Sequence, residues 1–121
     1  MDVREATSDE LSGVMNVLDG AALAVDVETA RAGIEADGTL VAVTDDDRIL
    51  GALVLDGEHI AAVAVRRRRR GQGIGSALVR AAVARRERLV AEFDAGLREF
   101  YAGLGFDLEG LDEPGRVRGV R

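Results

Sequence analysis

The sequence predicts an α+β domain in which a mixed, mostly antiparallel central sheet is flanked by helices. Two observations carry this prediction. Three strand-like segments follow one another in the middle of the chain, joined by turn signals at Asp45–Asp47 and Asp56-Gly57, as in an antiparallel meander. A helical segment, Ile74–Arg86, then precedes a further apolar strand. This helix would be a crossover that brings the later strand in parallel beside the meander.

The first part of the chain is expected to form a short strand and two helices. Val3–Ala6 has the length of a short strand, and Thr7–Asp9 offers caps for a helix that should end near Gly20. The apolar residues of that helix recur at helical spacing: Leu11, Val14, Met15 and Leu18. A second helix is expected over Val27–Ala36, with Asp37-Gly38 as its stop signal.

The remaining elements alternate between strands and helices. The meander strands are expected at Leu40–Thr44, Ile49–Leu55 and His59–Val65. After the crossover helix we expect a strand at Leu89–Phe93, a helix at Leu97–Leu104 stopped by glycines, and short strands at Phe106–Leu108 and Val117–Val120. The parallel contact would join the strand that begins at His59 to the strand that begins at Leu89. A functional site is expected at that junction.

The composition describes an acidic chain without lysine. Its 121 residues suit one domain, residues 1–121, and all 16 basic residues are arginine against 22 acidic residues, a net charge of −6. The absence of cysteine excludes disulfides and thiolate metal sites. Without a secretory signal pattern or an apolar run of about 20 residues, we expect a cytoplasmic protein with no membrane partner. Such a composition is typical of halophilic proteins and also of high-GC genomes.

One segment concentrates positive charge and glycine. Between residues 66 and 88 there are nine arginines and one acidic residue. The strand that ends at Val65 leads through Arg66–Arg70 into Gly71, Gly73 and Gly75, which open the next helix. Alternating glycines let backbone N–H groups converge on one point, and a helix N-terminus adds about half a positive charge there. The sequence therefore predicts a pyrophosphate site.

A dinucleotide site is one alternative for this loop. Gly71 and Gly73 match the start of a Gly-x-Gly-x-x-Gly fingerprint, but Ser76 stands at its third glycine. Glu92 or Asp94 could be the acidic residue expected about 20 positions later. The antiparallel hairpins before the loop and its five arginines argue against this fold. A lysine-dependent phosphate loop is excluded because the chain has no lysine.

The same loop resembles a known family motif. The run Arg-Gly-Gln-Gly-Ile-Gly at Arg70–Gly75 resembles the acyl-CoA loop of the GCN5-related N-acetyltransferases (GNAT), with the pattern Arg/Gln-x-x-Gly-x-Gly/Ala after a strand ending in valine. Phe100–Phe106 is similar to the family's Phe-Tyr-x-x-x-Gly-Phe segment, and the predicted elements follow the family's order. The resemblance implies a GNAT fold with a splayed strand pair that holds acyl-CoA. It also implies direct acetyl transfer from acetyl-CoA to an amine, with no metal.

The resemblance also implies cofactor-binding residues. Backbone groups around Val63, Ala64 and Val65 would pair with the pantetheine arm, and an N–H such as that of Val65 would stabilise the oxyanion. The loop residues that would bind the pyrophosphate are Arg70, Gly71, Gln72, Gly73, Ile74, Gly75 and Ser76. Asp94 stands where the family often has asparagine, and it could equally cap the following helix.

The implied catalytic groups are an acid and a base. Tyr101, the sole tyrosine, would stand near the CoA sulfur as general acid. Glu58 or the only histidine, His59, could be the base, or water could replace it. Strand alternation would put these two on opposite faces, His59 with Ala61, Val63 and Val65, and Glu58 with Ile60 and Ala62.

Other functions and partners stay open at this stage. The chain could be a non-catalytic acyl-CoA-binding regulatory domain, or a nucleic-acid-binding module that uses Arg66–Arg70, although no aromatic residue interleaves that run. The acceptor would be a small-molecule or peptide amine. Acidic residues that could attract a cationic amine are Asp45–Asp47, Asp107, Glu109, Asp112 and Glu113. The short C-terminal strands leave an edge at which a homodimer could form.

Overall fold

The computed structural model describes residues 1–20, 26–36 and 38–121. Asp37, the first residue of the predicted stop after the second helix, lies outside these ranges. The strands are β1 (Asp2–Glu5), β2 (Thr39–Val43), β3 (Ile49–Asp56), β4 (His59–Val65), β5 (Val90–Asp94), β6 (Asp107–Gly110) and β7 (Arg116–Val120). The helices are α1 (Leu11–Gly20), α2 (Val27–Glu35), α3 (Ile74–Val83) and α4 (Arg98–Gly103), with 3-10 turns η1 (Ser8–Glu10), η2 (Arg67–Arg69) and η3 (Ala95–Leu97).

The strands described form one sheet in the order β1-β2-β3-β4-β5-β7-β6. Each neighbouring pair is antiparallel except β4 and β5, which are parallel. The predicted α+β class, the meander and the parallel crossover are therefore confirmed. A dinucleotide-binding domain requires a largely parallel sheet, so that alternative is wrong.

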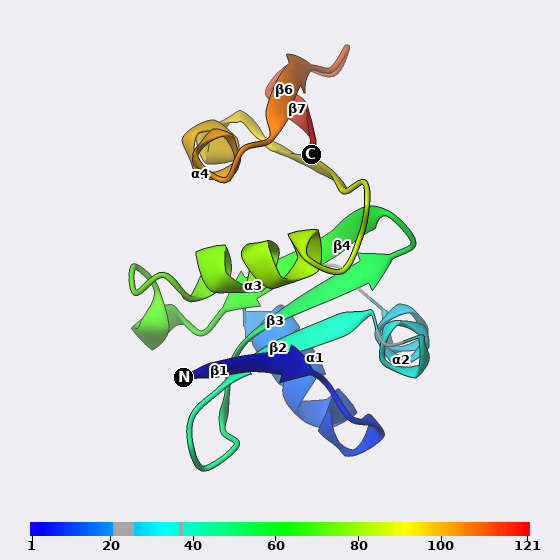
Figure 1. Cartoon of the computed structure of the whole chain (residues 1–121), viewed down its shortest axis with the longest axis vertical. Helices are drawn as coiled ribbons and strands as arrows, with labels where there is room; N and C mark the ends of the chain where they lie inside the picture. Colours follow the sequence, from blue (N-terminus) through cyan, green and yellow to red (C-terminus); the bar gives the residue numbers. More distant parts are fainter. Residues whose placement is uncertain (21–25, 37) are drawn as a thin grey trace.

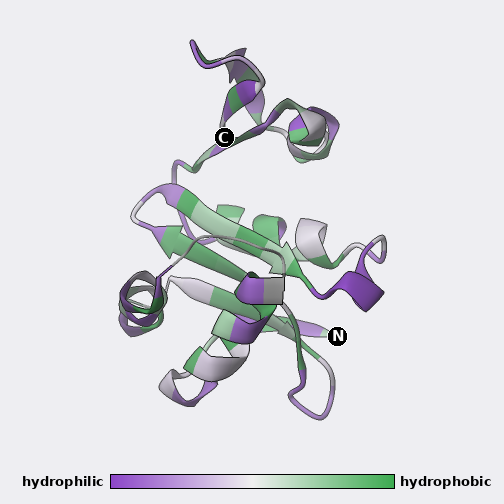
Figure 2. Ribbon diagram, turned by 180° about the vertical axis from the view of Figure 1, so that it is seen from behind, coloured by the Kyte–Doolittle hydropathy of each residue, from purple (hydrophilic) through white to green (hydrophobic). Residues whose placement is uncertain are grey.

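Two apolar cores lie on opposite faces of the sheet. One contains residues of α3 and α4, and the other contains residues of α1 and α2. Figure 1 shows α3 in front of β3 and β4, with α1 behind the sheet, and the strands between the helices are strongly hydrophobic in Figure 2. Strand β2 is buried on both sides because Leu40 and Ala42 enter the first core, whereas Val41 and Val43 enter the second.

The first two helices begin at the polar caps that the sequence provides. The carboxylate of Glu10 accepts hydrogen bonds from the Thr7 backbone N–H at 3.0 Å and from its hydroxyl at 3.3 Å. Arg4 in β1 donates to the same carboxylate at 2.7 and 2.9 Å, and these bonds lower the pKa of Glu10 to about 2. At α2, Asp26 accepts from the Thr29 N–H at 2.8 Å.

The crossover helix is shorter than the sequence predicts. It ends at Val83 rather than Arg86. The N–H of Arg85 donates to the carbonyl of Ala82 at 3.0 Å, a bond that tightens the last turn, and the Arg86 guanidinium donates to the Gly57 carbonyl at 3.1 Å. The helix therefore ends in a tightened turn, and a tertiary contact follows at Arg86, although the alanine and arginine residues would favour a longer helix.

Strand β4 contains a bulge that the sequence did not predict. Its register against β3 shifts by one residue at Ala61. The extra residue inverts the alternation, so Ile60 packs against the same core as Val63, and Ala62 packs in the other core. The prediction that Ile60 and Ala62 share a face is therefore wrong.

Strands β4 and β5 touch at one end only. Their parallel register contains the single pair His59 and Val90, where the Val90 N–H donates to the Glu58 carbonyl at 2.8 Å. In Figure 1, the unit formed by β5, β6, β7 and α4 stands apart from the rest of the sheet beyond this contact. Across the described ranges, no helix combines the length and apolar character that a membrane span would need.

Candidate functional site

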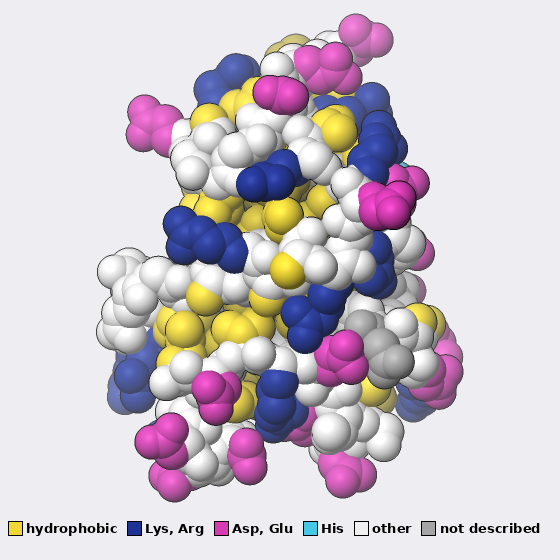
Figure 3. Space-filling model, in the orientation of Figure 1, with side chains coloured by type: hydrophobic (Ala, Val, Ile, Leu, Met, Phe, Trp, Pro, Cys, Tyr) yellow, Lys and Arg dark blue, Asp and Glu magenta, His cyan; other side chains and the backbone are white. Residues whose placement is uncertain are grey.

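A cleft of about 770 Å³ lies where β4 and β5 separate, as the sequence predicts for the site. It extends from the bulged strand to the N-terminus of α3 and to α4. Its walls carry both apolar and arginine side chains. In the space-filling view of Figure 3, hydrophobic side chains are exposed across the middle of the molecule, with arginines beside them. The cleft can therefore hold a ligand with an extended apolar part and an anionic part.

The β4 wall of the cleft presents backbone groups. The N–H of Arg66 donates to the Leu50 carbonyl at 2.9 Å, so these two residues form a hydrogen-bonded pair. In an antiparallel ladder such pairs alternate with pairs whose N–H and C=O groups point away from the partner strand. The registered pairs continue from Gly51 with Val65 to Leu53 with Val63. The backbone groups of Val63 and Val65 therefore point away from β3 and into the cleft.

The β5 wall presents a second row of backbone groups. Leu89 and Arg121 exchange hydrogen bonds of 3.0 and 2.9 Å, which fixes the alternation of the β5–β7 ladder. By the same rule, the backbone groups of Val90, Glu92 and Asp94 point toward β4. At Val90 they meet β4, and beyond it they face the cleft. An extended ligand between the two rows could pair with both, as an added strand does.

The loop at the mouth of the cleft is built for an anion. Gly71 and Gly73 have φ values of 77° and 81°, a left-handed conformation that favours glycine, and Gly73 is the N-cap of α3. The first N–H groups of a helix have no acceptors within it and carry partial positive charge. In α3 these belong to Ile74, Gly75 and Ser76, which all line the cleft. The arrangement suits a phosphate group.

The arginine run is divided between structure and site. The Arg66 guanidinium donates to the Ile49 carbonyl at 2.7 Å and to Oδ1 of Asn16 at 2.8 Å, so it ties the loop to β3 and α1. Arg69 and Arg70 line the cleft, and Nε of Arg70 donates to the carbonyl of Val65 at 3.3 Å. Figure 2 shows the turn η2, which contains the exposed residues Arg67–Arg69, in the colour of hydrophilic residues.

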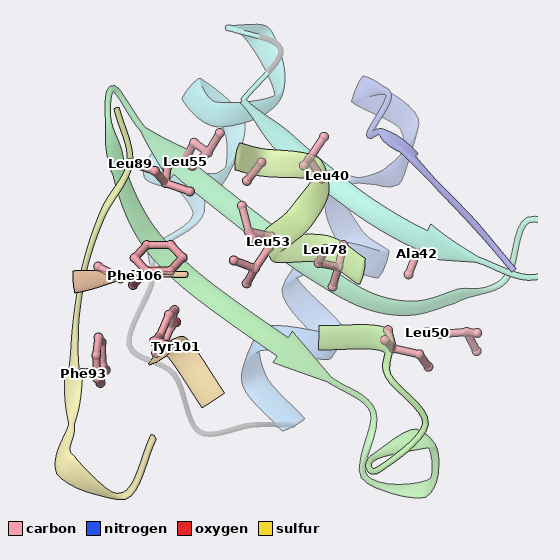
Figure 4. Close-up of a cluster of buried hydrophobic side chains, with 14 of the residues drawn as sticks. Leu40, Ala42, Leu50, Leu53, Leu55, Leu78, Leu89, Phe93, Tyr101 and Phe106 are labelled. Atoms are coloured by element: carbon pink, nitrogen blue, oxygen red, sulfur yellow. The ribbon is translucent and has the colours of Figure 1, made fainter. Parts of the chain in front are cut away.

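Tyr101 is buried among aromatic rings at the inner end of the cleft. Its ring stacks on Phe93 with centroids 4.1 Å apart and lies at a steep angle to Phe106 at 5.2 Å (Figure 4). The ring of Phe100 also meets it nearly at a right angle, with centroids 5.0 Å apart. The residue is 5% exposed and lines the cleft. Burial raises the pKa of Tyr101 to about 12, so its hydroxyl keeps its proton at neutral pH. Within the described ranges, no side-chain hydrogen bond engages that hydroxyl.

The structure brings most of the predicted site residues together. Those that line the cleft are Val63, Ala64, Val65, Arg70, Gly71, Gly73, Ile74, Gly75, Ser76, Asp94 and Tyr101. Gln72 belongs to the same loop and is exposed, but it is not among the lining residues. Asp94 accepts a hydrogen bond from Arg116 at 3.0 Å and makes no side-chain cap for η3.

The two predicted bases lie apart from this group. Glu58 and His59 are exposed at the end of β4 where it joins β5, and neither lines the cleft. Glu58 is 3.7 Å from the guanidinium of Arg88. For the ranges described, no group of three or more acidic or histidine side chains is placed to hold a metal ion.

Sequence reasoning missed part of the cleft wall. The additional lining residues are Ile60, Ala61, Ala62, Arg69, Ala91, Glu92, Phe93, Leu97, Phe100 and Arg116. Phe100 stands in the Phe-Tyr segment, so the motif could have indicated it. Arg116 reaches the cleft through the register of β7 against β5, which no local pattern reveals.

Comparisons with known proteins agree with this architecture. Residues 8–121 match the family model described as an acetyltransferase (GNAT) domain. The peptidyl-lysine N-acetyltransferase YjaB of Salmonella typhimurium is 40% identical over 76 residues, which cover 60% of this chain and 52% of that protein. The chain thus spans about half the length of this curated relative.

Solved structures with the same fold include two with high overlap. Rv2747 from Mycobacterium tuberculosis, in complex with CoA, is 18% identical, with 99% of this chain and 98% of that chain covered and a TM-score of 0.80. Ard1 from Thermoplasma volcanium is also 18% identical, with 99% and 95% covered and a TM-score of 0.79. These likenesses confirm the predicted fold, and the family model confirms the predicted resemblance. The chain belongs to the GNAT acetyltransferase family.

Proposed function

We propose that this chain is an acetyl-CoA-dependent N-acetyltransferase that moves an acetyl group directly to an amine acceptor. The observation that carries the proposal is the cleft between β4 and β5, which combines a glycine-rich helix N-terminus, two facing rows of backbone groups and a protonated tyrosine. Each feature corresponds to one part of an acyl-CoA. The described cleft wall contains no cysteine, and no histidine that could activate Ser76 as a nucleophile, so direct transfer is the simpler route.

Acetyl-CoA binding would use the backbone more than the side chains. The loop Arg70–Gly75 and the N-terminus of α3 would hold the pyrophosphate, with Arg69 and Arg70 adding positive charge. Val63 and Val65 would hydrogen-bond the pantetheine arm as if it were a strand.

Catalysis would combine an acid and an oxyanion donor. When bound, acetyl-CoA supplies a thioester carbonyl that is reactive toward amines. The N–H of Val65, which points into the cleft, would donate to the oxygen of that carbonyl as negative charge develops. The hydroxyl of Tyr101 would give its proton to the departing sulfur. Glu58 and His59 stay predictions as bases, and each would need water to reach the cleft.

The acceptor that we would test first is the side chain of lysine in a peptide. The relative from Salmonella typhimurium is named for acetylating peptidyl-lysine. A cytoplasmic location and a homodimer stay predictions.

Calorimetry and thermal unfolding with acetyl-CoA test the cofactor site. At 100 times its dissociation constant a ligand adds about 2.7 kcal/mol to stability, roughly 10 °C for a domain of this size. Gly73→Glu places a carboxylate where the pyrophosphate would bind, so this shift should disappear. Gly110→Glu adds the same charge in β6, away from the cleft, and should keep the shift. No shift in the unaltered protein would contradict the proposal.

Tyr101→Phe tests the step itself. Removing a general acid should lower kcat by about 100-fold or more while the Kd of acetyl-CoA stays unchanged. Release of free thiol with a lysine peptide as acceptor is the measurement. Equal turnover by the variant would contradict the acid role, and binding without turnover of any amine would favour the non-catalytic regulatory domain.

A further inference from the structure

Glu92 lies in the cleft wall without a role in the chemistry described so far. It is the third residue of β5, between Ala91 and Phe93. Phe93 and Ala91 enter the core that contains Tyr101, so strand alternation directs the Glu92 side chain to the opposite face of the sheet. Its side chain is 41% exposed there. The opening between the strands therefore has the tyrosine on one face and a carboxylate on the other.

The charge around Glu92 is unbalanced. Arg118 on β7 is 3.6 Å from the Glu92 carboxylate and 3.6 Å from that of Glu109, so one guanidinium is shared by two carboxylates. Both distances exceed a good N–H···O hydrogen bond, which leaves Glu92 with capacity to accept. Asp94 differs, because Arg116 already donates to it at 3.0 Å. The group of Glu92, Arg118 and Glu109 carries a net negative charge that one cation would neutralise.

The wall opposite Glu92 is apolar. Ala61 and Ala62 at the bulge of β4 line the cleft on that side, and each contributes only a methyl group. Methyl groups offer no hydrogen-bond partner and leave space beside the carboxylate, so an alkyl chain can lie against them. The carboxylate and this apolar wall together favour an ammonium group carried on an alkyl chain.

We infer that Glu92 binds the cationic acceptor amine and positions its nitrogen at the opening between β4 and β5, on the face opposite Tyr101. This inference rests on the proposed acetyltransferase function. The acceptor class is then an alkyl ammonium, as at the end of a lysine side chain, and not a neutral aromatic amine.

The proton balance of the reaction agrees with this placement. The bound ammonium loses one proton to water, and the neutral nitrogen attacks the thioester carbon. As the carbon–nitrogen bond forms, the carbon–sulfur bond breaks and the sulfur takes the proton of Tyr101. The nitrogen gives its next proton to water, and Tyr101 is reprotonated by water. The net products are the amide, a thiol and one released proton.

The test compares Glu92→Gln with Glu87→Gln, which removes an equal charge from an exposed residue outside the cleft. Two acceptors are used: Nα-acetyl-lysine amide, which is cationic at neutral pH, and aniline, which is neutral. Thiol release gives kcat and KM, calorimetry gives the Kd of acetyl-CoA, and thermal unfolding checks that each variant is folded. Glu92→Asp serves as the conservative variant.

We expect Glu92→Gln to raise the KM of the lysine amide about tenfold or more, as loss of a charge-assisted contact does. The Kd of acetyl-CoA and the kcat/KM of aniline should stay unchanged, Glu87→Gln should stay near the unaltered protein, and Glu92→Asp should recover part of the loss. Equal effects of the Glu92 and Glu87 variants would overturn the inference, and so would turnover of aniline in preference to the lysine amide. Acetyl-CoA binding without turnover of the lysine amide would overturn it as well. Absence of acetyl-CoA binding would instead refute the proposed acetyltransferase function on which this inference rests.

Discussion

Arg66→Ala should lower the stability of the domain and the affinity for acetyl-CoA together. The guanidinium donates at 2.7 Å to the Ile49 carbonyl, in a partly buried position, and at 2.8 Å to Asn16 on the surface. A hydrogen bond to a charged group contributes about 1.5–3 kcal/mol, and an exposed one less, so we expect a loss of about 2 kcal/mol. The unfolding entropy of a chain this long is about 0.25 kcal/mol/K, so Tm should fall by about 8 °C.

The neighbouring arginine, Arg67, provides a matched control for this experiment. Arg67→Ala removes the same side chain one residue later, in η2, where the arginine is exposed. Differential scanning calorimetry gives the two Tm values, and titration with acetyl-CoA gives the two Kd values. Arg66→Lys keeps the charge but can satisfy only one of the two acceptors well, so it should lie between. If Arg66→Ala and Arg67→Ala unfold at the same temperature, the reasoning that Arg66 anchors the loop is refuted.

Three further outcomes follow from the backbone and from two shifted pKa values. Gly73→Ala should cost about 1–2 kcal/mol in thermal unfolding because its φ is 81°, whereas Gly110→Ala should cost nothing. Arg4 lowers the pKa of Glu10 to about 2, so its contribution is full above pH 4.5 and is lost as pH falls toward 2. Glu10→Gln should therefore cost roughly 2 kcal/mol at pH 7 and flatten the acid limb of a stability profile. Burial raises the pKa of Tyr101 to about 12, so the free energy of unfolding should fall as pH rises from 10 to 12. Tyr101→Phe should remove that alkaline loss in chemical denaturation, and an unchanged profile would contradict the burial of the hydroxyl.

The strand boundaries show how far local patterns reach. Strand β4 has the predicted bounds, His59–Val65, because a turn dipeptide stands before it and the arginine run follows it. Helix α3 was predicted too long because helix propensity continues to Arg86, whereas in the structure Arg86 lies beyond the helix and donates to the Gly57 carbonyl of a distant hairpin. The bulge at Ala61 also depends on the pairing with β3 and leaves no mark in the sequence.

In the candidate site, too, residues in local motifs could be predicted and residues placed by long-range packing could not. Tyr101 and the loop Arg70–Gly75 could be predicted because each lies in a local motif, and all of these residues except Gln72 line the cleft. Glu58 and His59 were predicted as bases from their place at the start of a strand. Whether they reach the cleft depends on the point at which β4 and β5 separate, and that point is set by long-range packing. The position of Glu92 opposite Arg118 depends on the register of β5 against β7, which could not be predicted from the local sequence.

The short contact between β4 and β5 means that a bound cosubstrate would also affect the stability of the sheet. The unit of β5, β6, β7 and α4 meets β4 through one registered residue pair, and the remaining contact is side-chain packing around Tyr101. Seams of this kind are where domains open locally without unfolding as a whole. A molecule bonded to both edges would close the ladder and couple the two parts of the sheet. The enzyme with this molecule bound would then unfold as one cooperative unit. Release of the product at the end of each turnover would remove the connection between the two parts of the sheet.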